Sequence, residues 1–182
     1  MKKIVMGFLA LTVMATVTNA QTEKGDWMVG GNIAISTATN NSQFAIQPMG
    51  GYFIAKNFVA GASVVLDFGK IGDTKTSVVS AGPFARYYIN LKNSAFKPFF
   101  HAEYDLGNQV TTAPLEKTKN TTGKFLLGAG GAFFINQNVA LEALAGYAHT
   151  KVQGLPTENG FFFRLGFQVH LLGSEVERVR GR

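Results

Sequence analysis

The sequence lacks cysteine and has few charged residues. None of its 182 residues is Cys, and only 15% are Asp, Glu, Lys or Arg. The absence of cysteine excludes disulfides and thiolate metal sites, and three scattered histidines do not suggest a metal cluster. Soluble domains carry about 25% charged residues, so this composition argues against an ordinary cytosolic protein. The basic residues form no run that would indicate nucleic-acid binding. We therefore expect no metal, no cofactor and no nucleic-acid partner.

Long hydrophobic runs are also scarce, and the one at the N-terminus has the form of an export signal. Residues 1–20, MKKIVMGFLALTVMATVTNA, carry two lysines, then an apolar stretch, then small or polar residues. This pattern predicts a signal peptide that is cleaved after Ala20. The most apolar later stretch, residues 125–135, is interrupted by glycine and too short for a spanning helix of about 20 residues. Such an exported chain is either a soluble β domain or a barrel that crosses an outer membrane.

The mature chain, which begins at residue 21, is expected to consist of eight strands. Apolar residues alternate with other residues between clusters of turn formers, which is typical of half-buried strands. Eight is also the smallest strand number typical of bacterial outer-membrane barrels. The predicted strands are residues 26–37, 44–54, 58–68, 77–90, 97–107, 123–135, 139–150 and 160–172.

The connections between these strands alternate in length. Those after the second, fourth and sixth strands are short, whereas most of the others are longer and polar, such as GKIGDTKT and NQVTTAPLEKTKNTT. Short periplasmic turns and long outer loops are typical of outer-membrane barrels. We therefore predict that positions 41, 73, 119 and 157 lie outside the cell and that positions 56, 93 and 137 face the periplasm.

A pair of aromatic residues precedes each short connection. Alternation directs one ring of each pair outward and the other inward. Aromatic rings are favourable at the membrane–water interface, so the outward rings are predicted to form an aromatic girdle around the barrel. The inward rings, together with Phe99, are predicted to form a floor that closes the barrel. The girdle and floor are assigned to Tyr52, Phe53, Tyr87, Tyr88, Phe133 and Phe134.

Alternation also sorts every strand into an uncharged face and a mixed face. A charged residue facing the bilayer midplane costs about 2–4 kcal/mol, so in a membrane barrel the mixed face must be the interior. In a soluble barrel the two faces would be exchanged. The mixed face is rich in glycine, which suits a narrow interior better than a solvated surface. Its predicted polar network comprises Arg86, His101, Glu103, Asp105, Glu142 and Arg164.

The mature chain resembles the small eight-stranded outer-membrane β-barrel proteins. The chain resembles the outer membrane protein beta-barrel domain family, a group that is similar to the OmpX and OmpA barrels. Within this family, it most resembles the members from Bacteroidetes. It rests on DWMVGGNIAIS at 26–36, PMGGYFIAKNFVAGAS at 48–63, PFARYYI at 83–89, KPFFHAEYDLG at 97–107, GAGGAFFINQNVALEALAGY at 128–147 and FRLGFQVHL at 163–171. It implies an all-β, eight-stranded antiparallel up-and-down transmembrane barrel over residues 21–172.

The resemblance also implies a place in the outer membrane of a Gram-negative bacterium. The last strand resembles the signal that such barrels present to the assembly machinery, with Arg164, Gly166, Val169 and Leu171 at its key positions. Residues 173–182 are then expected to form a short periplasmic tail. Other expected partners are membrane lipids and lipopolysaccharide, which exposed loop lysines would contact, and the barrel is expected to be a monomer.

A fold-level resemblance does not supply an activity, and three classes of function stay open. The leading hypothesis is a non-enzymatic barrel with an envelope-structural or surface-interaction role. The first alternative is a narrow channel or transporter for small or apolar solutes, although eight strands leave an interior that side chains can fill. The second is a lipid-modifying enzyme, for which the outward His149 is the candidate base, but no matching outward serine lies at its level.

Overall fold

The computed structural model describes residues 22–38, 41–91 and 94–173. The predicted signal peptide and the predicted tail beyond Gly173 lie outside this range. Eight strands account for most of it: β1 Trp27–Ala38, β2 Asn41–Ala55, β3 Phe58–Ile71, β4 Thr74–Tyr88, β5 Phe96–Thr112, β6 Lys117–Phe134, β7 Val139–Val152 and β8 Glu158–Leu171.

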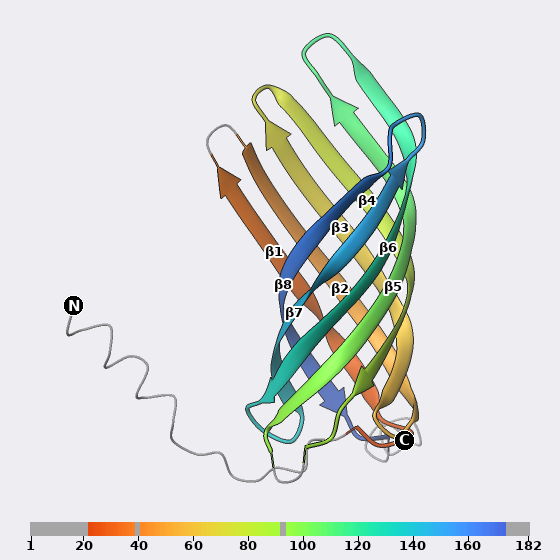
Figure 1. The fold of residues 1–182 in the computed structure, drawn as a ribbon, viewed down its shortest axis with the longest axis vertical. Helices are drawn as coiled ribbons and strands as arrows, with labels where there is room; N and C mark the ends of the chain where they lie inside the picture. Colours follow the sequence, from red (N-terminus) through yellow and green to blue (C-terminus); the bar gives the residue numbers. More distant parts are fainter. Residues whose placement is uncertain (1–21, 39–40, 92–93, 174–182) are drawn as a thin grey trace, which may run out of the picture.

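The strands form one closed antiparallel barrel in which each strand pairs with its sequence neighbours and β1 pairs with β8. This confirms the predicted up-and-down fold. β1 begins and β8 ends at the same end of the barrel, which also carries the β2–β3, β4–β5 and β6–β7 turns (Figure 1). This end is named the base here, and the opposite end is named the rim. None of the helices within the described ranges is long and apolar enough to cross a bilayer.

The prediction of long loops at the rim was wrong. β3 and β4 pair as far as Ile71 and Thr74, which leaves only Gly72 and Asp73 as the turn, with Gly72 in the left-handed region at φ 57°. β5 and β6 pair as far as Thr112 and Lys117. The polar segments read as loops are thus mostly strand, and the hairpins extend beyond the apolar part of the barrel (Figure 1). Strand pairing there needs no apolar face, because both faces can meet water.

The uncharged face is the outer surface of the barrel. On β8, Phe163, Leu165 and Phe167 are 61%, 57% and 49% exposed, whereas Arg164 and Gln168 on the alternate positions are buried. The same alternation holds on β5, where Phe100, Tyr104 and Leu106 face out. A soluble barrel would bury these rings. The outer surface instead has the uninterrupted apolar character that a lipid environment requires.

The face assignment predicts opposite tolerances for a new charge. Leu127 is 53% exposed on the outer surface of β6. The Leu127→Arg substitution should destabilise the folded barrel by about 2–4 kcal/mol, because it places a charge in lipid. Gln109 faces the interior near the rim, and Gln109→Arg should change stability by no more than about 0.5 kcal/mol. Urea refolding titrations in phospholipid vesicles measure both values. Equal losses would contradict the assignment of faces.

Candidate functional site

The base of the barrel interior is filled by aromatic side chains. Phe53, Tyr88 and Phe134 are 0%, 0% and 2% exposed, and Phe99 packs among them with its ring centroid 5.5 Å from that of Tyr88. Gly130 makes this packing possible, because a Cβ at that position would lie 2.5 Å from the Phe99 ring. The structure therefore places the four residues predicted as a floor in one layer that also contains Met28, Val59 and Leu144.

The outward members of the aromatic pairs lie on the outer surface at the base. Tyr52, Tyr87 and Phe133 are 37%, 49% and 45% exposed. Trp27, the only tryptophan, packs edge-on against Tyr52 with ring centroids 5.1 Å apart. Amphipathic rings in this position match the interfacial belt of a membrane barrel.

A buried ion pair crosses the interior above the floor. The Arg86 side chain on β4 donates from Nη1 to Oε2 of Glu142 on β7 at 2.6 Å and to the Tyr88 hydroxyl at 3.1 Å. The Tyr88 hydroxyl in turn donates to Oε1 of Glu142 at 3.0 Å. The Arg86 guanidinium also lies 4.3 Å from the centroid of the Phe99 ring. Hydrogen bonds, charge pairing and a cation–π contact together compensate the loss of water around Arg86.

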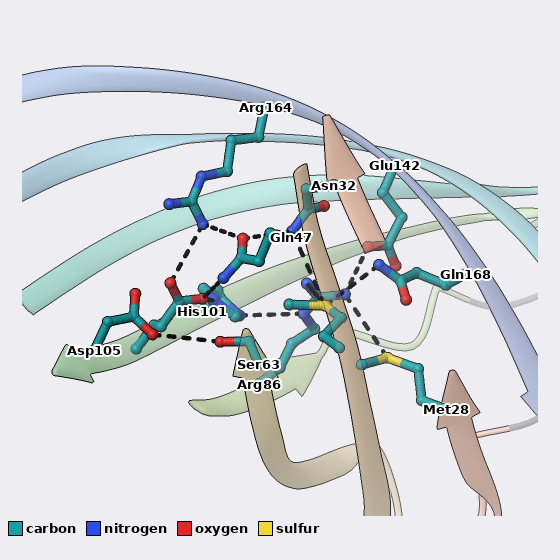
Figure 2. Close-up of polar contacts among 12 residues, drawn as sticks. Met28, Asn32, Gln47, Ser63, Arg86, His101, Asp105, Glu142, Arg164 and Gln168 are labelled. Carbon is teal, nitrogen blue, oxygen red and sulfur yellow. Dashed lines mark hydrogen bonds and ion pairs between the residues drawn. The ribbon is translucent and has the colours of Figure 1, made fainter. Parts of the chain in front are cut away.

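Glu103 is the centre of a second cluster, closer to the rim. It accepts hydrogen bonds from Gln47 at 2.7 Å, from His101 at 3.1 Å and from Arg164 at 3.4 Å, so it joins β2, β5 and β8. These three donors are labelled in Figure 2. Arg86 Nε donates to His101 Nδ1 at 3.3 Å. Because arginine can only donate, His101 Nδ1 must be the acceptor and Nε2 must carry the proton given to Glu103. The two clusters are thereby linked into one network.

Asp105 belongs to the rim side of this network. Its Oδ1 accepts a hydrogen bond from the Ser63 hydroxyl at 3.4 Å, and the residue is 1% exposed. The structure thus brings all six residues predicted for the interior polar network into the barrel. Of the three acids in this network, Glu142 is the one that forms an ion pair with Arg86.

Two inward lysines were missed by the sequence analysis. Lys97 is 3% exposed beneath the floor, where its Nζ donates to the Thr22 hydroxyl at 2.8 Å. Lys124 faces the interior near Asp67 and Asp105. Both occupy inward positions by simple alternation, two residues before Phe99 and Leu126, so the signal was present in the predicted strands. With them, the interior cations and carboxylates are closely balanced.

Above the network, toward the rim, the interior widens into a cavity of about 410 Å³. Its wall is polar and carries charges of both signs, including Asp67, Asp105, Lys124 and Glu158. No group of three or more potential metal ligands gathers within the described parts of the chain.

The outward histidine lies against an amide side chain. His149 is exposed on β7, and its Nδ1 lies 2.7 Å from Oδ1 of Asn159, its register partner on β8. A lipid-modifying enzyme needs a nucleophile activated by its base. The side chain that His149 engages is instead an amide, which cannot serve as that nucleophile.

Comparisons with known proteins agree with this architecture. The model of the outer membrane protein beta-barrel domain family matches residues 6–173, and the chain belongs to that family. Among solved structures, Neisserial surface protein A superposes with a TM-score of 0.61 at 19% identity, covering 81% of this chain and 97% of that one. The N-terminal β-barrel domain of Pseudomonas aeruginosa OprF gives a TM-score of 0.54 at 13% identity, covering 81% and 98%. These likenesses show the fold. No curated protein matches the chain with significant similarity.

The Arg86–Glu142 pair predicts a strong asymmetry between single and double variants. Arg86→Met should destabilise the barrel by about 3–5 kcal/mol, because it leaves Glu142 buried without its cation. Arg86→Met combined with Glu142→Gln should recover at least half of that loss, since no uncompensated charge remains. Urea refolding titrations of the two variants and of Glu142→Gln alone complete the cycle. Additive losses would show that the pair is not coupled.

Proposed function

We propose that this chain is a non-enzymatic barrel of a Gram-negative outer membrane that strengthens the envelope and presents its rim hairpins at the cell surface. The observation that carries the proposal is the filled interior. The aromatic floor and the charge-balanced network occupy the barrel from the base to beyond its middle. A selective pore tends to be lined by charges of one sign, so this interior supports a structural role over the channel alternative.

The rim hairpins support contact with anionic lipopolysaccharide. Lys70 on β3 and Lys75 on β4 are register partners, and both are exposed. Like charges directly opposite each other destabilise a sheet, but an anion bound between them would remove that cost. They border a groove of about 400 Å³ on the outer surface that also contains Phe44 and Phe68. Lysines above aromatic rings match an amphiphile with phosphate above and acyl chain below.

Surface presentation can be tested by thiol labelling, because the natural chain has no cysteine. Asp73→Cys, in the β3–β4 turn at the rim, should react with a membrane-impermeant maleimide on intact cells. Lys56→Cys, in the β2–β3 turn at the base, should react only after the outer membrane is permeabilised. Labelling of position 56 but not of position 73 on intact cells would reverse the orientation and contradict the proposal.

The lipopolysaccharide contact predicts a local effect of charge reversal. Lys70→Glu combined with Lys75→Glu should weaken binding of purified lipopolysaccharide to the refolded barrel by roughly tenfold or more, because two charge-assisted contacts are lost. Lys117→Glu combined with Lys119→Glu is the matched control, since it makes the same change of charge on another rim hairpin. Equal weakening by both pairs would reduce the contact to general electrostatic attraction.

A further inference from the structure

The junction between β1 and β8 is closed over only part of its length. Their register runs from Trp27 with Leu171 to Ile33 with Leu165, although within the described residues both strands continue toward the rim. β1 stays paired with β2 as far as Ala38, and β8 stays paired with β7 from Glu158. Figure 1 shows the β1–β2 hairpin leaning away from the β7–β8 hairpin above this point. The barrel wall is therefore open on the rim side of the β1–β8 seam.

Glycines hold the base side of the same seam together. A Cβ on Gly30 would lie 2.1 Å from the carbonyl oxygen of Phe167, and one on Gly166 would lie 2.4 Å from Oδ1 of Asn32. At these two positions the strands approach so closely that only glycine fits. The opening begins where this close contact ends.

The opening starts within the apolar layer. The outward residues beside it are Ile33, Ile35, Phe163 and Leu165, and they are 53%, 73%, 61% and 57% exposed. The apolar outward positions of β8 run from Leu171 to Phe161, and a tilted strand of about 9–11 residues crosses the hydrocarbon core. Peptide groups on the facing edges of the open seam are therefore at membrane depth, where each group without a partner costs several kcal/mol.

A groove of about 490 Å³ lies along this opening. The side chains of Ile33, Ile35, Phe163 and Leu165 form its apolar wall, and Gly31 and Gly166 leave space at its lower end. The volume falls within the range of about 300–1,000 Å³ that is usual for small-ligand sites. An apolar wall beside open peptide edges suits a molecule with one apolar chain and a polar head.

Arg164 lies next to the groove on the interior side of β8, although it is not one of the residues that line the groove. Continuing the β1–β8 register by one residue would place it opposite Ala34, the first position without a partner. Its side chain turns inward, where Nη1 donates to Gln47 and Glu103 (Figure 2). Its Nε and Nη2 donate to none of the residues that the structure describes. A guanidinium with free donors binds a carboxylate with both charge and geometry.

We propose that the open half of the β1–β8 seam binds a fatty acid from the surrounding membrane. The acyl chain lies in the groove, and the carboxylate passes between the strand edges to the free donors of Arg164. A single groove accommodates one chain, and a carboxylate is small enough to enter between two strands. Both points favour a free fatty acid over a phospholipid.

A tryptophan reporter in the groove can test this proposal. In the full mature barrel, Trp27→Phe combined with Phe163→Trp leaves one tryptophan in the groove. The refolded protein in phosphatidylcholine vesicles is titrated with 9,10-dibromostearate, whose bromines quench tryptophan at short range. We expect saturable quenching with one site per barrel. The matched control places the reporter outside the groove, on the outer surface of β6, with Trp27→Phe combined with Leu127→Trp; there quenching should rise only in proportion to the probe in the bilayer.

Three further measurements distinguish a bound fatty acid from other molecules that could occupy the groove. The methyl ester of the same probe and the Arg164→Lys variant should each raise half-saturation about tenfold, because charge or fork geometry is lost. Ile35→Cys blocked with benzyl maleimide should abolish saturation, whereas Val29→Cys blocked in the same way on the paired half should retain it. Linear quenching at both reporters, or equal binding of acid and ester, would overturn the proposal. A reporter signal that depends on barrel concentration would assign the groove to a second copy of the chain instead.

This test is independent of the proposed lipopolysaccharide contact. Lys70 and Lys75 lie on β3 and β4, away from the β1–β8 seam. Loss of one binding activity therefore leaves the other measurable.

Discussion

Every feature of this barrel depends on the requirement that backbone polar groups find partners inside the protein. A bilayer supplies no water to a strand edge, so the sheet must close on itself. Closure with eight strands leaves an interior just wide enough for side chains. That narrow space explains why Gly130 faces Phe99 and why Gly30 lies against β8. Where closure is incomplete, at the rim side of the β1–β8 seam, the same requirement calls for a partner from outside the chain.

The interior is ordered in layers from base to rim. Aromatic rings come first, then the Arg86–Glu142 pair, then the cluster around Glu103, and finally a polar cavity. The buried Arg86 and Arg164 each lie against a carboxylate, Glu142 and Glu103 respectively, since an isolated charge in this setting would be very costly. The layers also separate two tasks. The base half gives rigidity, and the rim half is where contact with other molecules is possible.

The sequence was sufficient to predict the faces of the strands, because the period of two is a local property. It placed the Arg86 side chain inside the barrel without any knowledge of which strands pair. It did not predict that Arg86 would reach Glu142, since that contact joins β4 to β7 across the barrel and depends on the stagger of the closed sheet. The same alternation also places the Lys97 side chain inside the barrel, but Lys97 was not included in the predicted interior network.

The rim hairpins and the seam mark two different limits of sequence reasoning. Polar residues such as those of the β5–β6 hairpin resemble a loop, because strands above the membrane need no apolar face. The point at which β1 leaves β8 is not encoded in either strand alone, since both keep a strand-like pattern beyond Ile33 and Leu165. It emerges only when the first and last strands meet.

The position of Glu103 has a consequence for how the barrel forms. Its partners Gln47 and Arg164 are separated from each other by 117 residues, and one belongs to the second strand while the other belongs to the last. A sheet that still lacks β8 cannot complete this cluster, and it holds a carboxylate with one cationic partner missing. Arrival of the last strand both closes the base half of the β1–β8 seam and supplies the Arg164 cation to Glu103. A partly built barrel therefore gains little stability and remains open to proteolysis.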